Sequence, residues 1–89
     1  MRTFITRRAR RDLEQLPEPL RDAVDAEILR IGVDPDARGK RLRGRLEGLR
    51  SARVGSRRII YRTEGDEAAL RVVILAIPPR RTAYRTRPR

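Results

Sequence analysis

Arginine is the residue type in this sequence that is best suited to binding and catalysis, and it is concentrated in one segment. Residues 38–62 contain ten basic residues and one acid, Glu47, so this segment holds nine of the eleven net positive charges. A guanidinium group forks onto two phosphate oxygens and stays charged at ordinary pH. The segment is therefore suited to binding a polyanion and stabilising charge on phosphate, and poorly suited to removing a proton.

Two of these arginines, Arg53 and Arg58, stand in stretches whose apolar residues alternate with the two-residue period of β-strands. The pair Gly55-Ser56 between the stretches predicts a turn. The alternation places the side chains of Arg53 and Arg50 on opposite faces of the sheet. It also predicts that Arg53 and Arg58 can project from one sheet face toward a phosphate. The residues alone leave open the alternative that both are solvated strand arginines.

Cysteine and histidine, which support much enzyme chemistry, are both missing. Their absence excludes disulfides, thiolate nucleophiles and the usual neutral-pH general base, and a metal site would need carboxylates alone. We therefore expect no metal and no cofactor. No apolar run approaches the length of a membrane span, and the N-terminus lacks the apolar region of a secretory signal, so we expect no membrane association and a cytoplasmic location.

The other segments carry little net charge except at the C-terminal end. Residues 1–37 have a net charge of −1, residues 63–77 of −2 and residues 78–89 of +5. A clustered excess of this kind favours a polyanion partner on one side of the fold, because neutralising phosphates releases counterions. The alternative is a basic surface that is merely solvated.

The first part of the chain predicts a strand and a helix. Residues 2–5 form a β-prone run, and the Thr6 hydroxyl can cap a helix that begins at Arg7. Pro17 ends this helix.

A second helix is expected to begin near Glu18 or Pro19 and to end at Gly32. Its apolar stripe consists of Leu20, Val24, Ile28 and Ile31. Its opposite face is interpreted as a solvated surface made of Arg21, Asp22, Asp25, Glu27 and Arg30.

The rest of the chain predicts strands. Residues 33–40 read as a loop, the two-residue period starts at Leu42, and Tyr61 is expected in the core. Residues 69–77 are apolar on both faces and predict the central strand. We expect one α+β domain of residues 1–89, in which an N-terminal strand and a helical hairpin pack on a mainly antiparallel sheet of about four strands. Residues 79–89 would form its basic C-terminal tail.

Two runs of residues carry a resemblance to a known family. They are L-R-G-R-L-E-G-L-R-S-A-R-V-G-S-R-R-I-I-Y at residues 42–61 and I-P-P-R-R-T-A-Y-R at residues 77–85. The specific feature is the combination of Arg-Val-Gly, then Arg58 and Tyr61 at fixed offsets, then a terminal apolar strand that runs into Arg-Arg-x-x-Tyr. Over nearly its whole length the chain resembles the RelE/ParE superfamily of type II toxin–antitoxin toxins, which implies a RelE-like fold.

Some positions depart from the family pattern. Ser51 stands where the family has a basic residue, Arg50 and Arg57 replace two tyrosines, and Pro78-Pro79 replaces Gly-His. The side chain of Arg50 or Arg57 could reach the place of the missing basic group.

The resemblance to the ribosome-dependent mRNA nucleases of this superfamily implies that Arg53, Arg58, Arg80 and Tyr84 are catalytic. The arginines would stabilise a phosphorane-like intermediate, and Tyr84 would relay a proton or stack on an unpaired base. On the residues alone, Tyr84 could equally fold over the core. RNA contacts are expected from Arg41, Arg43, Arg45, Arg50, Arg57, Arg81 and Arg85.

The function implied is that of a toxin which cleaves mRNA on the ribosome without a metal and so inhibits translation. Because histidine is missing, the geometry in which a ribosome presents mRNA is expected to supply much of the rate. The expected partners are a cognate antitoxin, in a toxin–antitoxin hetero-oligomer, and the ribosome with its mRNA. Two alternatives stay open: a ParE-like DNA gyrase inhibitor, and a non-catalytic basic RNA-binding module.

Overall fold

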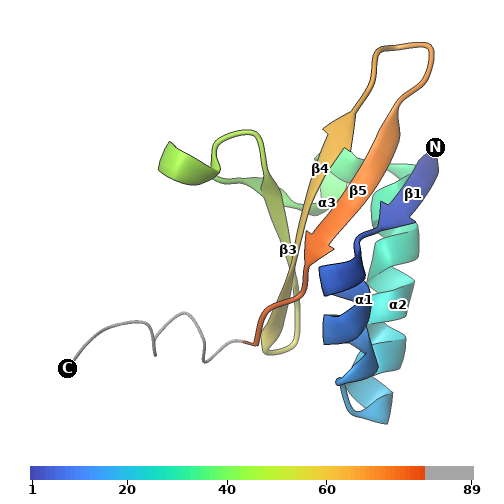
Figure 1. Cartoon of the computed structure of the whole chain (residues 1–89), viewed down its shortest axis with the longest axis vertical. Coiled ribbons are helices and arrows are strands. Elements are labelled where there is room, and N and C mark those ends of the chain that lie inside the picture. The colour runs from blue at the N-terminus through green and yellow to red at the C-terminus, as the bar shows by residue number, and fades with distance from the viewer. Residues whose placement is uncertain (80–89) are drawn as a thin grey trace.

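The computed structural model describes residues 1–79 of the 89-residue chain. In chain order the elements are β1 (Arg2–Ile5), α1 (Arg7–Glu14), α2 (Glu18–Val33), α3 (Pro35–Arg38), β2 (Lys40–Arg41), the 3-10 helix η1 (Gly44–Leu46), β3 (Arg50–Val54), β4 (Arg57–Glu64) and β5 (Arg71–Ala76). Figure 1 shows α1 and α2 side by side next to the sheet, and the segment with η1 projecting away from them. The α+β architecture expected from the sequence is confirmed.

The strands form one sheet in the order β1-β5-β4-β3-β2. β1 runs parallel to β5, and the other neighbouring strands are antiparallel. The sheet has five strands rather than about four, because Lys40–Arg41 pairs with β3 as a short edge strand. β5 has a partner on each side, as its apolar character predicted, but the middle strand of the sheet is β4.

The two long helices begin where the sequence predicts. The Thr6 hydroxyl accepts a hydrogen bond from the Ala9 amide at 3.1 Å and so caps α1. α2 begins after Pro17, but it does not end at Gly32. A Cβ at Gly32 would lie 2.7 Å from Thr3 Oγ1, so this glycine lets α2 approach β1 closely instead. In residues 1–79, no helix is long and apolar enough to cross a membrane.

The core lies between the helices and one face of the sheet. The helices contribute the stripe residues Val24, Ile28 and Ile31, all of which are buried. The sheet contributes Ala52, Ile59, Tyr61, Val72 and Ile74. Each fully buried aliphatic side chain stabilises the fold by about 1.5–3 kcal/mol. Among the described elements no helix covers the opposite face, which we call the open face.

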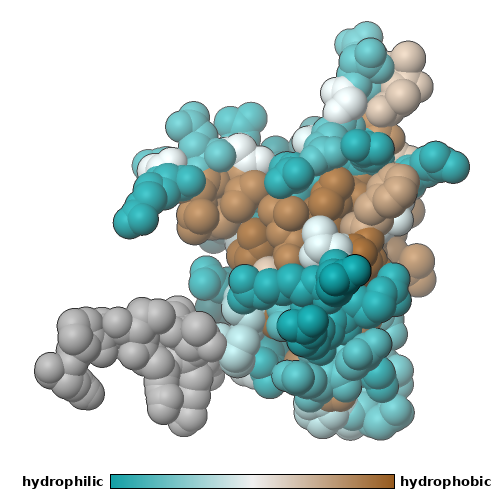
Figure 2. Space-filling model, in the orientation of Figure 1, coloured by the Kyte–Doolittle hydropathy of each residue, from teal (hydrophilic) through white to brown (hydrophobic). Residues whose placement is uncertain are grey.

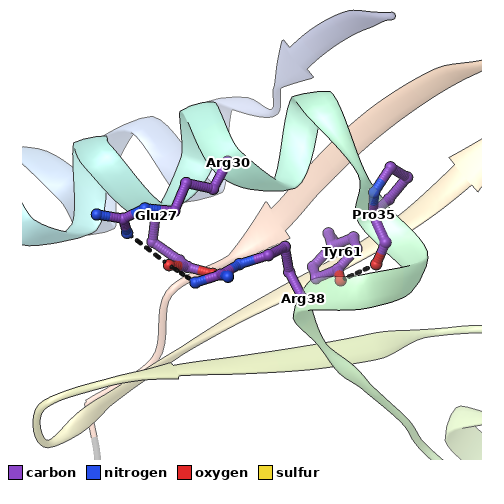
Figure 3. Close-up of polar contacts among 5 residues, drawn as sticks. All are labelled: Glu27, Arg30, Pro35, Arg38 and Tyr61. Atoms are coloured by element: carbon purple, nitrogen blue, oxygen red, sulfur yellow. Dashed lines mark hydrogen bonds and ion pairs between the residues drawn. The ribbon is translucent and has the colours of Figure 1, made fainter.

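The segment expected to be a loop, residues 33–40, contains the short helix α3 and the start of β2. α3 is tied to α2 and β4 (Figure 3). The Arg38 guanidinium donates to both carboxylate oxygens of Glu27, at 2.9 and 2.8 Å, and the Tyr61 hydroxyl donates to the Pro35 carbonyl at 2.6 Å. Tyr61 is in the core as predicted.

Glu27 does not lie on a solvated face, so that interpretation was wrong. Its side chain is only 5% exposed, and Arg30 donates a further hydrogen bond to it at 2.8 Å. The hydrogen bond from Arg38 has the largest effect and lowers the pKa of Glu27; burial opposes this, and Arg30 lowers it further. The helical pattern missed this contact because Arg38 comes from a separate element.

Candidate nucleic-acid interface

Arg53 and Arg58 are direct cross-strand partners on β3 and β4. Directly opposed residues of an antiparallel pair share a sheet face, with Cβ atoms about 4.5–5.5 Å apart. Both side chains are exposed, and neither forms an ion pair within residues 1–79. The structure therefore places together on the open face two guanidinium groups that have no ion-pair partner among these residues, as the alternation predicts.

A two-residue turn sets the register of these arginines. Gly55 and Ser56 connect β3 to β4, and Val54 pairs directly with Arg57. Gly55 has a φ of +58°. Glycine adopts this left-handed conformation without steric strain, whereas a residue with a side chain would be strained there. Without this tight turn, a one-residue slip would move Arg53 and Arg58 to different faces.

The middle of the open face is apolar. Ile60 follows Arg58 at the two-residue period of β4, and Val73 on β5 pairs with Phe4 on β1. Ile60 and Val73 are half-buried, and Phe4 is 43% exposed. Figure 2 shows apolar surface gathered over the sheet region, with hydrophilic surface above and below it. Such a surface offers contact area for a base or an apolar side chain beside the phosphate-binding arginines.

The far end of the open face carries a charge cluster that the sequence patterns did not single out. Glu64 pairs with Arg71 across β4 and β5, and it lies two residues from Arg62. Both arginines donate to its carboxylate: Arg62 through Nε at 2.7 Å and also through Nη2, and Arg71 at 3.1 and 2.9 Å. Arg62, with the larger effect, and Arg71 lower the pKa of Glu64. Glu64 thus engages both Arg62 and Arg71, whereas Arg2, which pairs with Arg71 across β1 and β5, forms no ion pair within residues 1–79.

Arg50 lies on the other face of the sheet. It pairs with Tyr61, whose side chain is in the core. Its guanidinium donates to the Gly39 carbonyl at 2.9 Å and forms an ion pair with the Asp36 carboxylate at 3.1 Å. Arg50 is therefore held beneath α3 and cannot take the place of the basic group missing at Ser51. Its predicted contact with RNA stays untested.

Arg41 and Arg43 lie beside Arg50 rather than beside Arg53. Arg41 pairs with Arg50, and all three line a cavity of about 750 Å³ together with Asp36, Glu47 and Leu49. Arg45 lies in η1 and is exposed. Arg57 pairs with Val54, which packs on the core, so it too belongs to the helix-side face. Of the expected RNA contacts, Arg41, Arg43 and Arg57 therefore lie apart from the open-face pair.

The chain leaves the sheet beside Arg58. Ala76, the last residue of β5, pairs with Ile60, and β5 runs antiparallel to β4. Two contacts from the start of the chain hold this point: the Thr6 hydroxyl donates to the Leu75 carbonyl at 3.0 Å, and the Ile77 amide donates to Asp12 Oδ2 at 2.9 Å. The expected site residues Arg80, Arg81, Tyr84 and Arg85 follow, and they lie outside the described residues.

Comparison with known proteins identifies the family. Residues 4–84 match the family model described as ParE toxin of the type II toxin–antitoxin system, parDE. The chain belongs to this family of type II toxin–antitoxin toxins. It is 41% identical over 85 residues to Toxin RelE of Mycobacterium tuberculosis, an alignment that covers 94% of this chain and 86% of that protein.

Two solved structures share the fold of this toxin. The toxin–antitoxin complex RelBE2 of Mycobacterium tuberculosis contains a chain that matches with a TM-score of 0.78 and 38% identity, covering 89% of this chain and 96% of that chain. The YoeB/ParE toxin from Agrobacterium tumefaciens matches with a TM-score of 0.75 and 21% identity, covering 89% and 98%. The resemblance to RelE/ParE toxins stated from the sequence is confirmed.

Proposed function

We propose that this toxin is an endoribonuclease that cleaves mRNA on the ribosome, in the cytoplasm, without a metal ion. The observation that carries the proposal is the exposed pair Arg53 and Arg58, which has no ion-pair partner within residues 1–79 and lies at the end of the sheet where β5 ends. The similarity to Toxin RelE supports it, and so does a segment of nine net positive charges that suits RNA.

In the proposed reaction the ribose 2′-oxygen attacks the neighbouring phosphorus. The bond from phosphorus to the 5′-oxygen breaks, a cyclic 2′,3′-phosphate forms, the 2′-hydroxyl loses its proton and the leaving 5′-oxygen gains one. Arg53 and Arg58 bind the non-bridging oxygens, whose negative charge grows in the transition state. Arg80 adds a third cation, and Tyr84 moves a proton or stacks on a base.

Tyr61, the one tyrosine among the described residues, is poorly placed to carry a proton because it is fully buried and its hydroxyl is used by Pro35. Burial raises its pKa further above the ordinary tyrosine value. With no histidine in the chain, positioning of the mRNA by the ribosome supplies the part of the rate that side chains cannot.

The partner proposed for storage of the toxin is an antitoxin, as in the complex RelBE2 to which this chain is similar. The open face combines the apolar side chains of Phe4, Ile60 and Val73 with the cations of Arg53 and Arg58. An antitoxin segment with apolar and acidic residues would cover both. Hydrogen exchange of the complex should then protect β1, β4 and β5; protection confined to α1 and α2 would contradict this placement.

Inhibition of DNA gyrase is the second candidate. The family model carries the name ParE, and Ser51, which pairs with Ile60 on the open face, supplies no cation beside Arg53. Induced expression followed by mapping of mRNA 5′ ends separates the two candidates. New 5′ ends within translated codons support the nuclease, whereas DNA breaks with intact mRNA support gyrase inhibition.

A further inference from the structure

Glu64 uses both edges of its carboxylate on the open face. Oε2 accepts from Arg62, and Oε1 accepts two hydrogen bonds from Arg71. Arg71 is also positioned by Phe4, because its guanidinium carbon lies 5.3 Å from the centre of that ring. Two arginines of the face are therefore preorganised around a single acid.

A guanidinium that donates to a carboxylate has the same fork occupied that would otherwise bind a phosphate. Arg62 and Arg71 donate through Nε and Nη2, the edge that forms bidentate contacts with such anions. Arg53 and Arg58 have no such partner within residues 1–79. Two guanidinium groups are thus unpaired within residues 1–79 at one end of the face, whereas at the other end Glu64 occupies those of Arg62 and Arg71 and leaves that of Arg2 unpaired.

The two ends are far enough apart to act separately. Arg58 and Glu64 are six residues apart on β4, which spans about 20 Å at 3.3 Å per residue. Along β4 the residues of the open face are, in order, Arg58, Ile60, Arg62 and Glu64. The arginine at the start of the strand is unpaired within residues 1–79, and the one near its end is ion-paired with Glu64.

We propose that Glu64 limits the RNA-binding surface of the toxin by occupying Arg62 and Arg71, which weakens phosphate binding at that end of the open face relative to the end with Arg53 and Arg58. Glu64 is in this sense a positioning residue: it leaves Arg2 as the unpaired arginine at the far end and so favours placement of one phosphodiester at the cleavage end. The inference rests on the proposed RNA-binding function of the open face.

The test is the substitution Glu64→Gln, which keeps the shape of the side chain and removes its charge. For single strands the slope of log K against log salt steepens by about 0.7 for each additional phosphate that the protein neutralises. Two freed arginines should therefore steepen the slope by about 1.4, and at about 0.1 M salt each should tighten binding roughly five-fold. The measurement is a salt titration of a labelled single-stranded oligouridylate binding to the full chain.

The matched control is Glu67→Gln, which removes the same charge from an exposed position in the adjacent turn. A further variant combines Glu64→Gln with Arg62→Gln and Arg71→Gln, and it should return the slope to that of the parent. An unchanged slope in Glu64→Gln overturns the proposal. So does an equal increase in slope in Glu67→Gln, or an increase that persists after both arginines are removed.

The double variant Arg53→Gln/Arg58→Gln separates this inference from the function on which it rests. If this variant binds the oligouridylate as the parent does, the open face is not the RNA surface and the proposed function fails. If it loses affinity while Glu64→Gln keeps the parental slope, the surface stands and the role of Glu64 fails. Circular dichroism of each variant checks that the fold is retained.

Discussion

Tyr61 connects the core to α3 through one buried hydrogen bond. Its ring is fully buried, and its hydroxyl donates to the carbonyl of Pro35, which is also buried. A Cβ at Gly39 would lie 2.5 Å from that hydroxyl, so the chain after α3 also passes directly over the tyrosine. A single side chain thus holds the segment that leads into β2 and the basic residues after it.

We expect Tyr61→Phe to lower the free energy of unfolding by about 1–3 kcal/mol, because the buried Pro35 carbonyl loses its donor. Urea unfolding should show a lower midpoint and an unchanged m-value. Leu29→Ala is the control, since Leu29 is 73% exposed and its loss should change stability by less than about 0.5 kcal/mol. A parental midpoint for Tyr61→Phe would show that the hydrogen bond contributes nothing.

At the scale of elements, α3 is fastened to α2 by the carboxylate of Glu27. Arg30 and Arg38 approach it from two elements, although their own side chains are 55% and 39% exposed. The buried carboxylate strengthens these charged hydrogen bonds, and solvent at the exposed guanidinium groups screens them in part. The contact orients the end of α3, from which Gly39 leads directly into β2.

The lowered pKa of Glu27 gives stability a dependence on pH. A carboxylate whose pKa is depressed by folding stabilises the native state above its unfolded pKa of about 4.3, and this stabilisation is lost as the pH falls through the folded pKa. Glu64 contributes with the same sign.

Glu27→Gln should therefore be less stable than the parent near neutral pH, and the difference should shrink as the pH falls below about 4.3. Thermal unfolding of both proteins across this range measures it. A difference that stays constant down to the lowest pH would mean that the charge of Glu27 does not stabilise the fold.

Local sequence patterns predicted the helices and strands, but they did not predict the contacts between these elements. The Thr6 cap, the stripe of Val24, Ile28 and Ile31, and the facing of Arg53 depend on residues near one another in sequence, and all are confirmed. The burial of Glu27 depends on Arg38, eleven residues away. β2 could not be predicted from the sequence, because two residues are too few to show an alternation of apolar and polar side chains.

The site was predicted in part for the same reason. Alternation along β3 and β4 brings Arg53 and Arg58 to one face, and it sends Arg50 and Arg57 to the other. The cluster of Glu64 with Arg71 was missed, because it needs the register of β4 against β5. The assignments of Arg80 and Tyr84 stay predictions, since both lie outside the described residues.

For the whole molecule, charge and shape divide the sheet into two working faces. The helix-side face packs against the helices, and there Arg50 binds Asp36 of α3 and the Gly39 carbonyl. On the open face Glu64 pairs with both Arg62 and Arg71, whereas Arg53 and Arg58 have no ion-pair partner in the part of the chain that the structure describes. Within residues 1–79 the open face exposes apolar side chains beside arginines, a combination that is typical of an interaction surface.

The central claim is that the open-face arginine pair stabilises the transition state of mRNA cleavage. Single-turnover cleavage on programmed, saturating ribosomes tests it directly, with Arg58→Ala and Arg53→Ala compared with the parent and with Arg10→Ala on the exposed side of α1. Loss of one such donor costs about 2.7–4 kcal/mol of activation free energy, so each open-face variant should cleave roughly 100- to 1,000-fold more slowly while ribosome binding changes far less. Cleavage by Arg58→Ala and Arg53→Ala at the parental rate would contradict the claim.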